Sequence, residues 1–415
     1  MIKILVVEDS NIVVKILKHV LSSCDAFQAE YAMSFAEAKK LVENTDQDYF
    51  AALIDLNLPD APDGEVVDYT LKLGIPTIVL TGSFDETRRE KLLAKGIVDY
   101  VTKEGKYSYE YCRNVVLRLI KNQDVKVLVV DDSDTARNFV VNLLKLHLYQ
   151  VLEAKDGVQG IKVLLENPEI KLLITDYNMP RMDGCELVKN IRMKYEKTDL
   201  VIIGLSDQGE SALSAKFIKT GANDFLKKPL NHEEFYCRVT HNMEFVDMVE
   251  AIRDASFRDD LTGAYNRKYF YSQYRSLLDS SGGTAANLSV AVLDLDNFSA
   301  INNRYGSDIG DFILKSVVVI FTRLFERFVF VRADGQQFYI LMPGLPTAKA
   351  MAFVEKVRQI LCARAIEFGD NSVVITFSAG VSDVTGAGID SALNLCAVSL
   401  KGAKEAGGDL VFGDA

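Results

Sequence analysis

Short apolar runs and amphipathic stretches alternate along the first 230 residues. Apolar runs such as ILVV at 4–7 and VLVV at 127–130 are separated by stretches of roughly ten to fifteen residues in which apolar positions recur at helical spacing. Such alternation indicates βαβ units. We therefore expect parallel sheets covered by helices on both faces.

This pattern occurs twice, as three pairs of matching segments show. KILVVEDS at 3–10 returns as KVLVVDDS at 126–133, ALIDLNLPDAPDG at 52–64 returns as LITDYNMPRMDG at 173–184, and VDYVTK at 98–103 returns as NDFLKKP at 223–229. The offset stays near 120–125 residues, about one small domain. The sequence therefore predicts a tandem duplication, with domains over 1–122 and 124–245.

The stretch 231–257 continues a helical pattern beyond the second domain. Its recurring apolar residues are Phe235, Val239, Val246, Val249 and Ile252. The first half is expected to be the terminal helix of the second domain. The second half has no sheet left to cover, so we expect a helical linker over 246–257 that serves as a stalk or a dimer seam.

Composition narrows the class of protein. The chain has 415 residues, of which 48% are apolar and 25% are charged, as in ordinary globular proteins of several domains. It has no run of eighteen apolar residues, and MIKILVVED reads as a buried strand and not as a signal peptide. The net charge is −11 without a Lys/Arg block. We expect a cytoplasmic protein with no membrane segment and no DNA partner.

Candidate chemistry gathers where the expected strands end. In parallel sheets, binding sites form at the carboxyl ends of the strands. The residues at these ends are Glu8, Asp9, Asp55, Thr81 and Lys103 in the first copy and Asp131, Asp132, Asp176, Ser206 and Lys228 in the second. Clustered acids supply oxygen ligands for Mg²⁺, which a nucleophilic carboxylate needs because its charge repels an incoming phosphoryl group. This set therefore supports phosphoryl transfer to a carboxylate.

Both copies closely resemble the receiver domains of response regulators, a flavodoxin-like (βα)5 fold. The resemblance implies that Asp55 and Asp176 are phosphoacceptors, phosphorylated by a histidine kinase or a phosphotransfer protein. It implies a Mg²⁺ site in each copy, formed by Glu8, Asp9, Asp55 and the carbonyl of Asn57, and by Asp131, Asp132, Asp176 and the carbonyl of Asn178. The implied switch residues are Thr81, Tyr100 and Lys103 in the first copy and Ser206, Phe225 and Lys228 in the second.

The loop after the last strand differs between the copies. By the same resemblance, the Lys228-Pro229 peptide bond is expected to be cis. The first copy has Glu104 where that proline would stand. Its last loop is therefore expected to differ from the family pattern.

From about residue 258 the pattern changes to mixed strands and helices. RDDLTGAYNRKYF at 258–270, AVLDLDNFSAINNRYGSDIGDFIL at 291–314, VRADGQQFYILMP at 331–343, TFSAGVS at 376–382 and GAKEAGG at 402–408 resemble the GGDEF domain of diguanylate cyclases. This resemblance implies an α+β, nucleotidyl cyclase-like domain over 258–415, which we call the GGDEF-like domain. The receiver–receiver–GGDEF order is that of PleD-type response regulators.

An active enzyme of this family condenses two GTP molecules into cyclic di-GMP. By resemblance, Asp294 keeps one metal-binding carboxylate, Leu295 offers a metal-binding carbonyl, Asn302 and Asp311 keep the guanine contacts, and Lys404 remains. The signature, however, reads Asp334, Gly335, Gln336, Gln337 and Phe338, so both acidic positions are amides. Ser299, Ser307 and Gly408 replace a lysine, a histidine and an arginine of the family pattern.

These losses predict turnover near background. Two unit charges about 4 Å apart interact by about 4 kcal/mol at an effective dielectric of about 20, which is roughly a thousandfold in rate. The leading hypothesis is a phosphorylation-controlled homodimer whose GGDEF-like domain contacts an unknown downstream protein. The alternatives are a weakly active diguanylate cyclase and a sensor that binds GTP or another guanine nucleotide without turnover.

Overall fold

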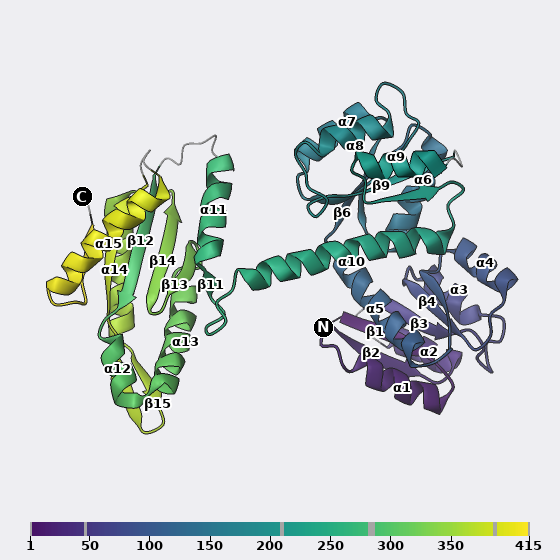
Figure 1. Ribbon diagram of the computed structural model, residues 1–415. Helices are drawn as coiled ribbons and strands as arrows, with labels where there is room; N and C mark the ends of the chain where they lie inside the picture. Colours follow the sequence, from purple (N-terminus) through teal and green to yellow (C-terminus); the bar gives the residue numbers. More distant parts are fainter. Residues whose placement is uncertain (1, 45–47, 208–210, 281–286, 385–387, 414–415) are drawn as a thin grey trace. The chain divides into compact units, whose positions relative to one another are not determined.

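The computed structural model describes residues 2–44, 48–207, 211–280, 287–384 and 388–413 (Figure 1). The chain divides into two compact units, Met1–Val249 and Glu250–Ala415. The first unit holds both copies of the repeated domain, and each copy has its own sheet.

The first sheet has five parallel strands in the order β2-β1-β3-β4-β5. They are β1 (Ile2–Val7), β2 (Phe27–Ala32), β3 (Ala51–Asp55), β4 (Thr77–Thr81) and β5 (Asp99–Thr102). The helices are α1 (Asn11–Leu21), α2 (Phe35–Glu43), α3 (Glu65–Lys72), α4 (Glu86–Lys95) and α5 (Lys106–Asn122). Alternate residues of β1 enter different cores, Ile4 and Val6 on one face and Leu5 and Val7 on the other, so helices cover both faces.

The second sheet repeats this arrangement, in the order β10-β9-β8-β6-β7. Its strands are β6 (Lys126–Val130), β7 (Gln150–Ala154), β8 (Ile170–Asp176), β9 (Val201–Ser206) and β10 (Asp224–Lys227). Its helices are α6 (Asp134–Leu146), α7 (Gly157–Glu166), α8 (Gly184–Ile191), α9 (Ser211–Thr220) and α10 (His232–Ser256). The expected tandem pair of parallel α/β domains is confirmed.

Helix α10 is a single element of 25 residues, so the expected terminal helix and the expected linker are continuous. Phe235, Val239 and Val246 are buried and belong to the core of the second sheet. Ile252 near the end of the helix is 70% exposed. The first half of the predicted pattern therefore covers the sheet, whereas Ile252 lies at the surface.

The second unit is built around a six-stranded sheet in the order β11-β13-β14-β12-β17-β18. Its strands are β11 (Tyr265–Asn266), β12 (Leu288–Leu295), β13 (Val329–Asp334), β14 (Gln337–Pro343), β17 (Phe377–Asp383) and β18 (Val411–Gly413), with a separate hairpin of β15 (Ala365–Phe368) and β16 (Asn371–Val374). Its helices are α11 (Arg267–Ser280), α12 (Phe298–Tyr305), α13 (Ser307–Leu324), α14 (Thr347–Cys362) and α15 (Ile389–Glu405). The central strand β12 is antiparallel to both neighbours, as expected of an α+β domain.

The hairpin of β13 and β14 corrects one detail of the sequence prediction. Asp-Gly is a strong signal for a two-residue hairpin turn, so the sequence favours Asp334-Gly335 as the turn. In the structure Asp334 pairs with Gln337, so the turn residues are Gly335 and Gln336. Gly335 has φ +50°, a left-handed conformation that glycine adopts without the steric cost of a Cβ atom. The turn therefore begins one residue later than predicted.

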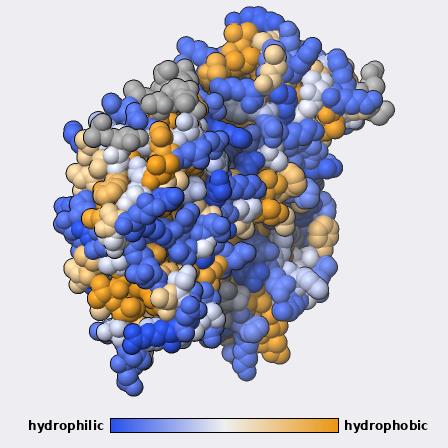
Figure 2. All heavy atoms as spheres, turned by 60° about the vertical axis from the view of Figure 1, so that its left-hand side comes forward, coloured by the Kyte–Doolittle hydropathy of each residue, from blue (hydrophilic) through white to orange (hydrophobic). Residues whose placement is uncertain are grey.

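The face shown in Figure 2 is mostly hydrophilic, with smaller hydrophobic groups between the hydrophilic residues. In the described residues, no helix has both the length and the apolar character that crossing a membrane requires. All six cysteines carry free thiols.

Candidate functional site

In the first domain, the candidate residues meet at the carboxyl ends of β1, β3, β4 and β5. Glu8 follows β1 and is fully buried, and Asp55 ends β3 and is 5% exposed. Lys103 follows β5, and its Nζ lies 2.7 Å from Oε2 of Glu8 and 2.9 Å from Oδ2 of Asp55. The amide N–H of Asn57 donates to Oδ1 of Asp55 at 3.2 Å. One lysine thus bridges two buried carboxylates.

Burial and charge act against each other in this cluster. Burial raises the pKa of Glu8 above its ordinary value, although Lys103 acts to lower it. Burial alone would lower the pKa of Lys103, but its hydrogen bonds to Glu8 and Asp55 raise the pKa above the usual value. The lysine is therefore held in its charged form against the acids.

The second domain has the same arrangement. Lys228 Nζ lies 2.9 Å from Oδ2 of Asp131 and 2.6 Å from Oδ1 of Asp176, and both acids are buried. The amide N–H of Asn178 donates to Oδ2 of Asp176 at 2.8 Å. Burial raises the pKa of Asp176, against the opposing effect of Lys228. The expected cis peptide bond between Lys228 and Pro229 is present.

The two clusters differ in how closely they gather their acids. Glu8, Asp9 and Asp55 each place an oxygen within 4.8 Å of the others, and these residues fit the oxygen-rich coordination of Mg²⁺. Among the described residues, Asp131, Asp132 and Asp176 do not meet that spacing, and Asp132 is exposed. In both domains the lysine bridges two of the three acids, but among the described residues only the first domain brings the third acid close enough for all three to reach one ion.

The expected switch residues lie beside these acids. Thr81 ends β4, and its hydroxyl donates to the carbonyl oxygen of Ser83 at 3.0 Å. The hydroxyl of Tyr100 lies 3.4 Å from the same oxygen, and the Tyr100 side chain is buried. In the second domain, Ser206 is buried at the end of β9, and the ring centroid of Phe225 lies 5.9 Å from that of Phe217.

In the GGDEF-like domain, Asp294 near the end of β12 is 4% exposed and has three side-chain partners. Gln337 Nε2 donates to Oδ2 at 2.8 Å, Gln336 Nε2 donates to Oδ1 at 3.3 Å, and Lys404 Nζ from α15 contacts Oδ1 at 2.5 Å. Antiparallel pairing places Gln337 directly opposite Asp294. The side chains that contact Asp294 are thus two amides and an ammonium group, with no second carboxylate among them.

Of the other polar residues of this domain, Asn302 and Asp311 were predicted from the sequence but Asp296 was not. Asn302 lies on α12, and its buried Oδ1 has no hydrogen-bond partner among the described residues, while Asp311 lies on α13. Asp296 was absent from the candidate list, yet it accepts hydrogen bonds from Thr376 Oγ1 at 3.0 Å and Ser378 Oγ at 2.7 Å. The signal for Asp296 was its spacing two residues after Asp294 on the same strand end.

Comparisons with known proteins agree with these geometries. The response regulator receiver domain model matches residues 4–108 and 127–240, and the diguanylate cyclase GGDEF domain model matches residues 256–409. The Response regulator PleD of Caulobacter vibrioides is 26% identical over 276 residues, 63% of this chain and 60% of that relative. A chemotaxis protein CheY homolog of Campylobacter jejuni is 42% identical over 106 residues, 25% of this chain and 82% of that relative.

Among solved structures, a two-component system response regulator/GGDEF domain protein is similar with a TM-score of 0.55 and 39% identity. The match covers 60% of this chain and 100% of that chain. In its match to PleD, the present chain spans less than two thirds of the relative's length. Because the receiver matches cover more than half of the sequence, the chain belongs to the response regulator family, with two receiver domains followed by a GGDEF domain.

Proposed function

We propose that this response regulator accepts phosphoryl groups on Asp55 and Asp176 and signals through its GGDEF-like domain by protein contact instead of by synthesis of cyclic di-GMP. The phosphoryl donor is a histidine kinase or a phosphotransfer protein. Mg²⁺ is the cofactor that supports phosphoryl transfer in the receivers. The downstream partner is a protein that recognises the GGDEF-like domain.

The contacts of Asp294 carry this proposal. A cyclase needs acidic side chains and a metal ion at this position, because the metal offsets the charge of the triphosphate. Here the Asp294 carboxylate is hydrogen-bonded to two amides and paired with the ammonium group of Lys404. The site therefore satisfies its buried carboxylate with groups of the chain itself, which supports a domain retained for contact.

Exposed apolar side chains on α10 support a homodimer controlled by phosphorylation. Phe245, Met248 and Ile252 are 49%, 66% and 70% exposed and follow one another at spacings of three and four residues. Such spacing places apolar side chains on one face of a helix, where a second copy of the chain buries them. Light scattering with and without beryllofluoride and Mg²⁺ measures this change of mass, and a mass that does not respond contradicts it.

A cyclase assay tests the central proposal. The full chain is incubated with GTP and Mg²⁺, with and without beryllofluoride, and cyclic di-GMP is measured by mass spectrometry. We expect product at background level in both conditions. Product at the ordinary rate of a diguanylate cyclase would overturn the proposal and favour a working enzyme.

A second candidate function is a guanine-nucleotide sensor without turnover. It rests on the buried and unpartnered Oδ1 of Asn302, because such an atom is costly unless a ligand or water hydrogen-bonds to it. Calorimetry with a non-hydrolysable GTP analogue separates this function from pure contact signalling. Binding that disappears in the Asn302→Ala variant would favour the sensor, and no heat of binding would rule it out.

A further inference from the structure

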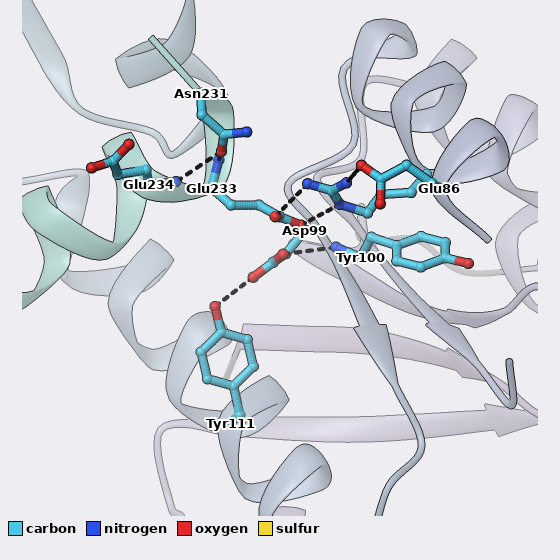
Figure 3. A network of polar contacts seen from close by, with 8 residues as sticks. Glu86, Asp99, Tyr100, Tyr111, Asn231, Glu233 and Glu234 are labelled. Carbon is cyan, nitrogen blue, oxygen red and sulfur yellow. Dashed lines mark hydrogen bonds and ion pairs between the residues drawn. The ribbon is translucent and has the colours of Figure 1, made fainter. Parts of the chain in front are cut away.

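The two receivers contact each other through an ion pair that joins α4 of the first to α10 of the second (Figure 3). Arg89 donates from Nε to Oε1 of Glu233 at 2.8 Å and from Nη2 to Oε2 at 2.6 Å. This is a bidentate pair, the stronger geometry for arginine and a carboxylate. Arg89 is only 8% exposed, so water and salt screen the pair less than a surface ion pair.

Both partners lie next to the switch residues of their own receivers. Arg89 belongs to α4, the helix that follows the loop containing Ser83, whose carbonyl holds the hydroxyl of Thr81. Glu233 lies in the first turn of α10, five residues after Lys228. Its N–H donates to Oδ1 of Asn231 in the loop between them at 3.0 Å. Each loop therefore connects an acceptor cluster directly to one end of the ion pair.

The contact continues along β5 of the first receiver, close to Tyr100. His147 of the second receiver is buried, and its Nε2 lies 3.2 Å from the carbonyl oxygen of Val98. The His147 ring stacks on Tyr236 of α10 with centroids 3.4 Å apart. Asp99, which lies between Val98 and Tyr100, accepts a hydrogen bond from the hydroxyl of Tyr111 within the first receiver at 2.6 Å (Figure 3). A shift of α4 or β5 is therefore resisted by contacts from the second receiver.

We infer that the two acceptor sites are coupled through Arg89 and Glu233, so that occupancy of one receiver strengthens binding of a phosphoryl group or its mimic at the other. This inference rests on the proposed function, in which Asp55 and Asp176 are both acceptors. The ion pair of Arg89 and Glu233 is formed in the unphosphorylated chain. Phosphorylation of Asp55 turns the Thr81 hydroxyl from Ser83 to a phosphoryl oxygen and moves α4. Phosphorylation of Asp176 moves Lys228 and its loop toward the phosphoryl group and shifts the first turn of α10. Either event separates α4 from α10.

The sign of the coupling follows from the fact that both receivers share the ion pair of Arg89 and Glu233. The first receiver to be occupied must break the ion pair, and the second then switches without that cost. Coupling between two sites is reciprocal, so Asp55 affects Asp176 as strongly as Asp176 affects Asp55. The ion pair thus makes the chain respond to two phosphorylation events more steeply than two separate receivers would.

The test measures binding of beryllofluoride with Mg²⁺ to the full chain by ¹⁹F NMR. The Asp55→Asn and Asp176→Asn variants each give the affinity of one site alone and assign its resonance. In the unsubstituted chain, we expect the second site to bind about fivefold more tightly than in the single-site variant. The double variant Arg89→Gln, Glu233→Gln removes both charges of the inter-receiver pair and leaves only Glu86, a mostly exposed second partner of Arg89, without its arginine. It should remove this tightening and strengthen binding at each site alone.

Asp247→Asn provides the matched control, because Asp247 also lies on α10, fourteen residues after Glu233, and pairs with Arg118 of the first receiver at 2.6 Å. The coupling should survive this change. Independent binding in the unsubstituted chain, opposite coupling, or equal loss of coupling in the Asp247→Asn variant would each overturn the inference. Absence of binding at either site in the single-site variants would instead reveal failure of the proposed acceptor function, and the coupling would fall with it.

Discussion

Each receiver and the GGDEF-like domain contain an ion pair between a lysine and a buried carboxylate, but the side chains around that pair differ. Lys103 and Lys228 each bridge two carboxylates. Lys404 meets the single carboxylate of Asp294, which two glutamine amides also contact. The same type of ion pair, between a lysine and a carboxylate, therefore lies in sites of different net charge.

The two sites differ in the number of acids that surround the lysine. In the first receiver, Glu8, Asp9 and Asp55 outnumber Lys103, so the cluster retains negative charge that attracts Mg²⁺. In the GGDEF-like domain, one ammonium balances one carboxylate, and the amides satisfy the remaining acceptor positions. The amides Gln336 and Gln337 thus stand beside a buried carboxylate where, in the first receiver, further acids stand beside Asp55.

The largest effect is expected from removing the acceptor carboxylates of the receivers. Asp55→Asn and Asp176→Asn should each abolish one acyl phosphate formed with acetyl phosphate, because an amide is not a nucleophile for this transfer. Mass spectrometry of the intact chain counts the phosphoryl groups. The Asp294→Asn variant is the control and should retain both. Labelling that survives in the chain with both receiver substitutions would contradict the acceptor assignment.

The next largest effect is expected from placing acids beside Asp294 in the GGDEF-like domain. Gln336→Glu and Gln337→Glu together should raise its affinity for Mn²⁺ by about a thousandfold or more, since even one added unit charge about 4 Å from the ion contributes about 4 kcal/mol at an effective dielectric of about 20. Electron paramagnetic resonance then counts one more bound ion per chain than before the change. Cyclase activity should stay low because Ser299 and Gly408 remain. Full activity would show that these two positions do not matter.

Much of the receiver fold and its candidate sites could be predicted from the sequence, because short-range patterns carry them. The apolar runs are the strands, and each acid or hydroxyl stands at a strand end where parallel topology brings it to one edge. Lys103 and Lys228 meet the expected acids for this reason. The closer grouping of Glu8, Asp9 and Asp55 depends on side-chain placement, which the nearly identical motifs did not reveal.

The remaining features depend on contacts between distant parts of the chain. Arg89 and Glu233 are 144 positions apart and look like ordinary surface residues of helices in the sequence. The amide contacts of Asp294 could not be read from the motif alone, since they require the register that places Gln337 opposite Asp294. The hairpin turn was misplaced by one residue because Asp-Gly is a strong turn signal that the strand pairing overrode.

The two units also differ in their histidines, and this difference predicts a moderate effect of pH. All four histidines lie within the first 249 residues. Burial lowers the pKa of His147 to about 3, so the unfolded chain binds a proton below about pH 6.5 that the folded chain does not. Stability is full above that pH and is lost as the pH falls toward 3. Urea unfolding should show a loss of about 1 kcal/mol between pH 6.5 and 5.5 relative to the His147→Gln variant. A parallel pH response of the two proteins would contradict this role of His147.

The smallest effect is expected when the lysine of the GGDEF-like domain, Lys404, is replaced. Its side chain is 38% exposed, so solvent screens the ion pair with Asp294, and Gln336 and Gln337 still hydrogen-bond to the carboxylate when the lysine is removed. Lys404→Gln should therefore lower the free energy of unfolding by less than about 1 kcal/mol. Lys401→Gln is the matched control on the same helix, since the pair of Lys401 with Glu405 is more exposed and its loss should have no measurable effect. A loss above about 2 kcal/mol for Lys404→Gln would mean that the amides do not satisfy Asp294, and that this buried carboxylate still depends on a cation, as the receiver acids do.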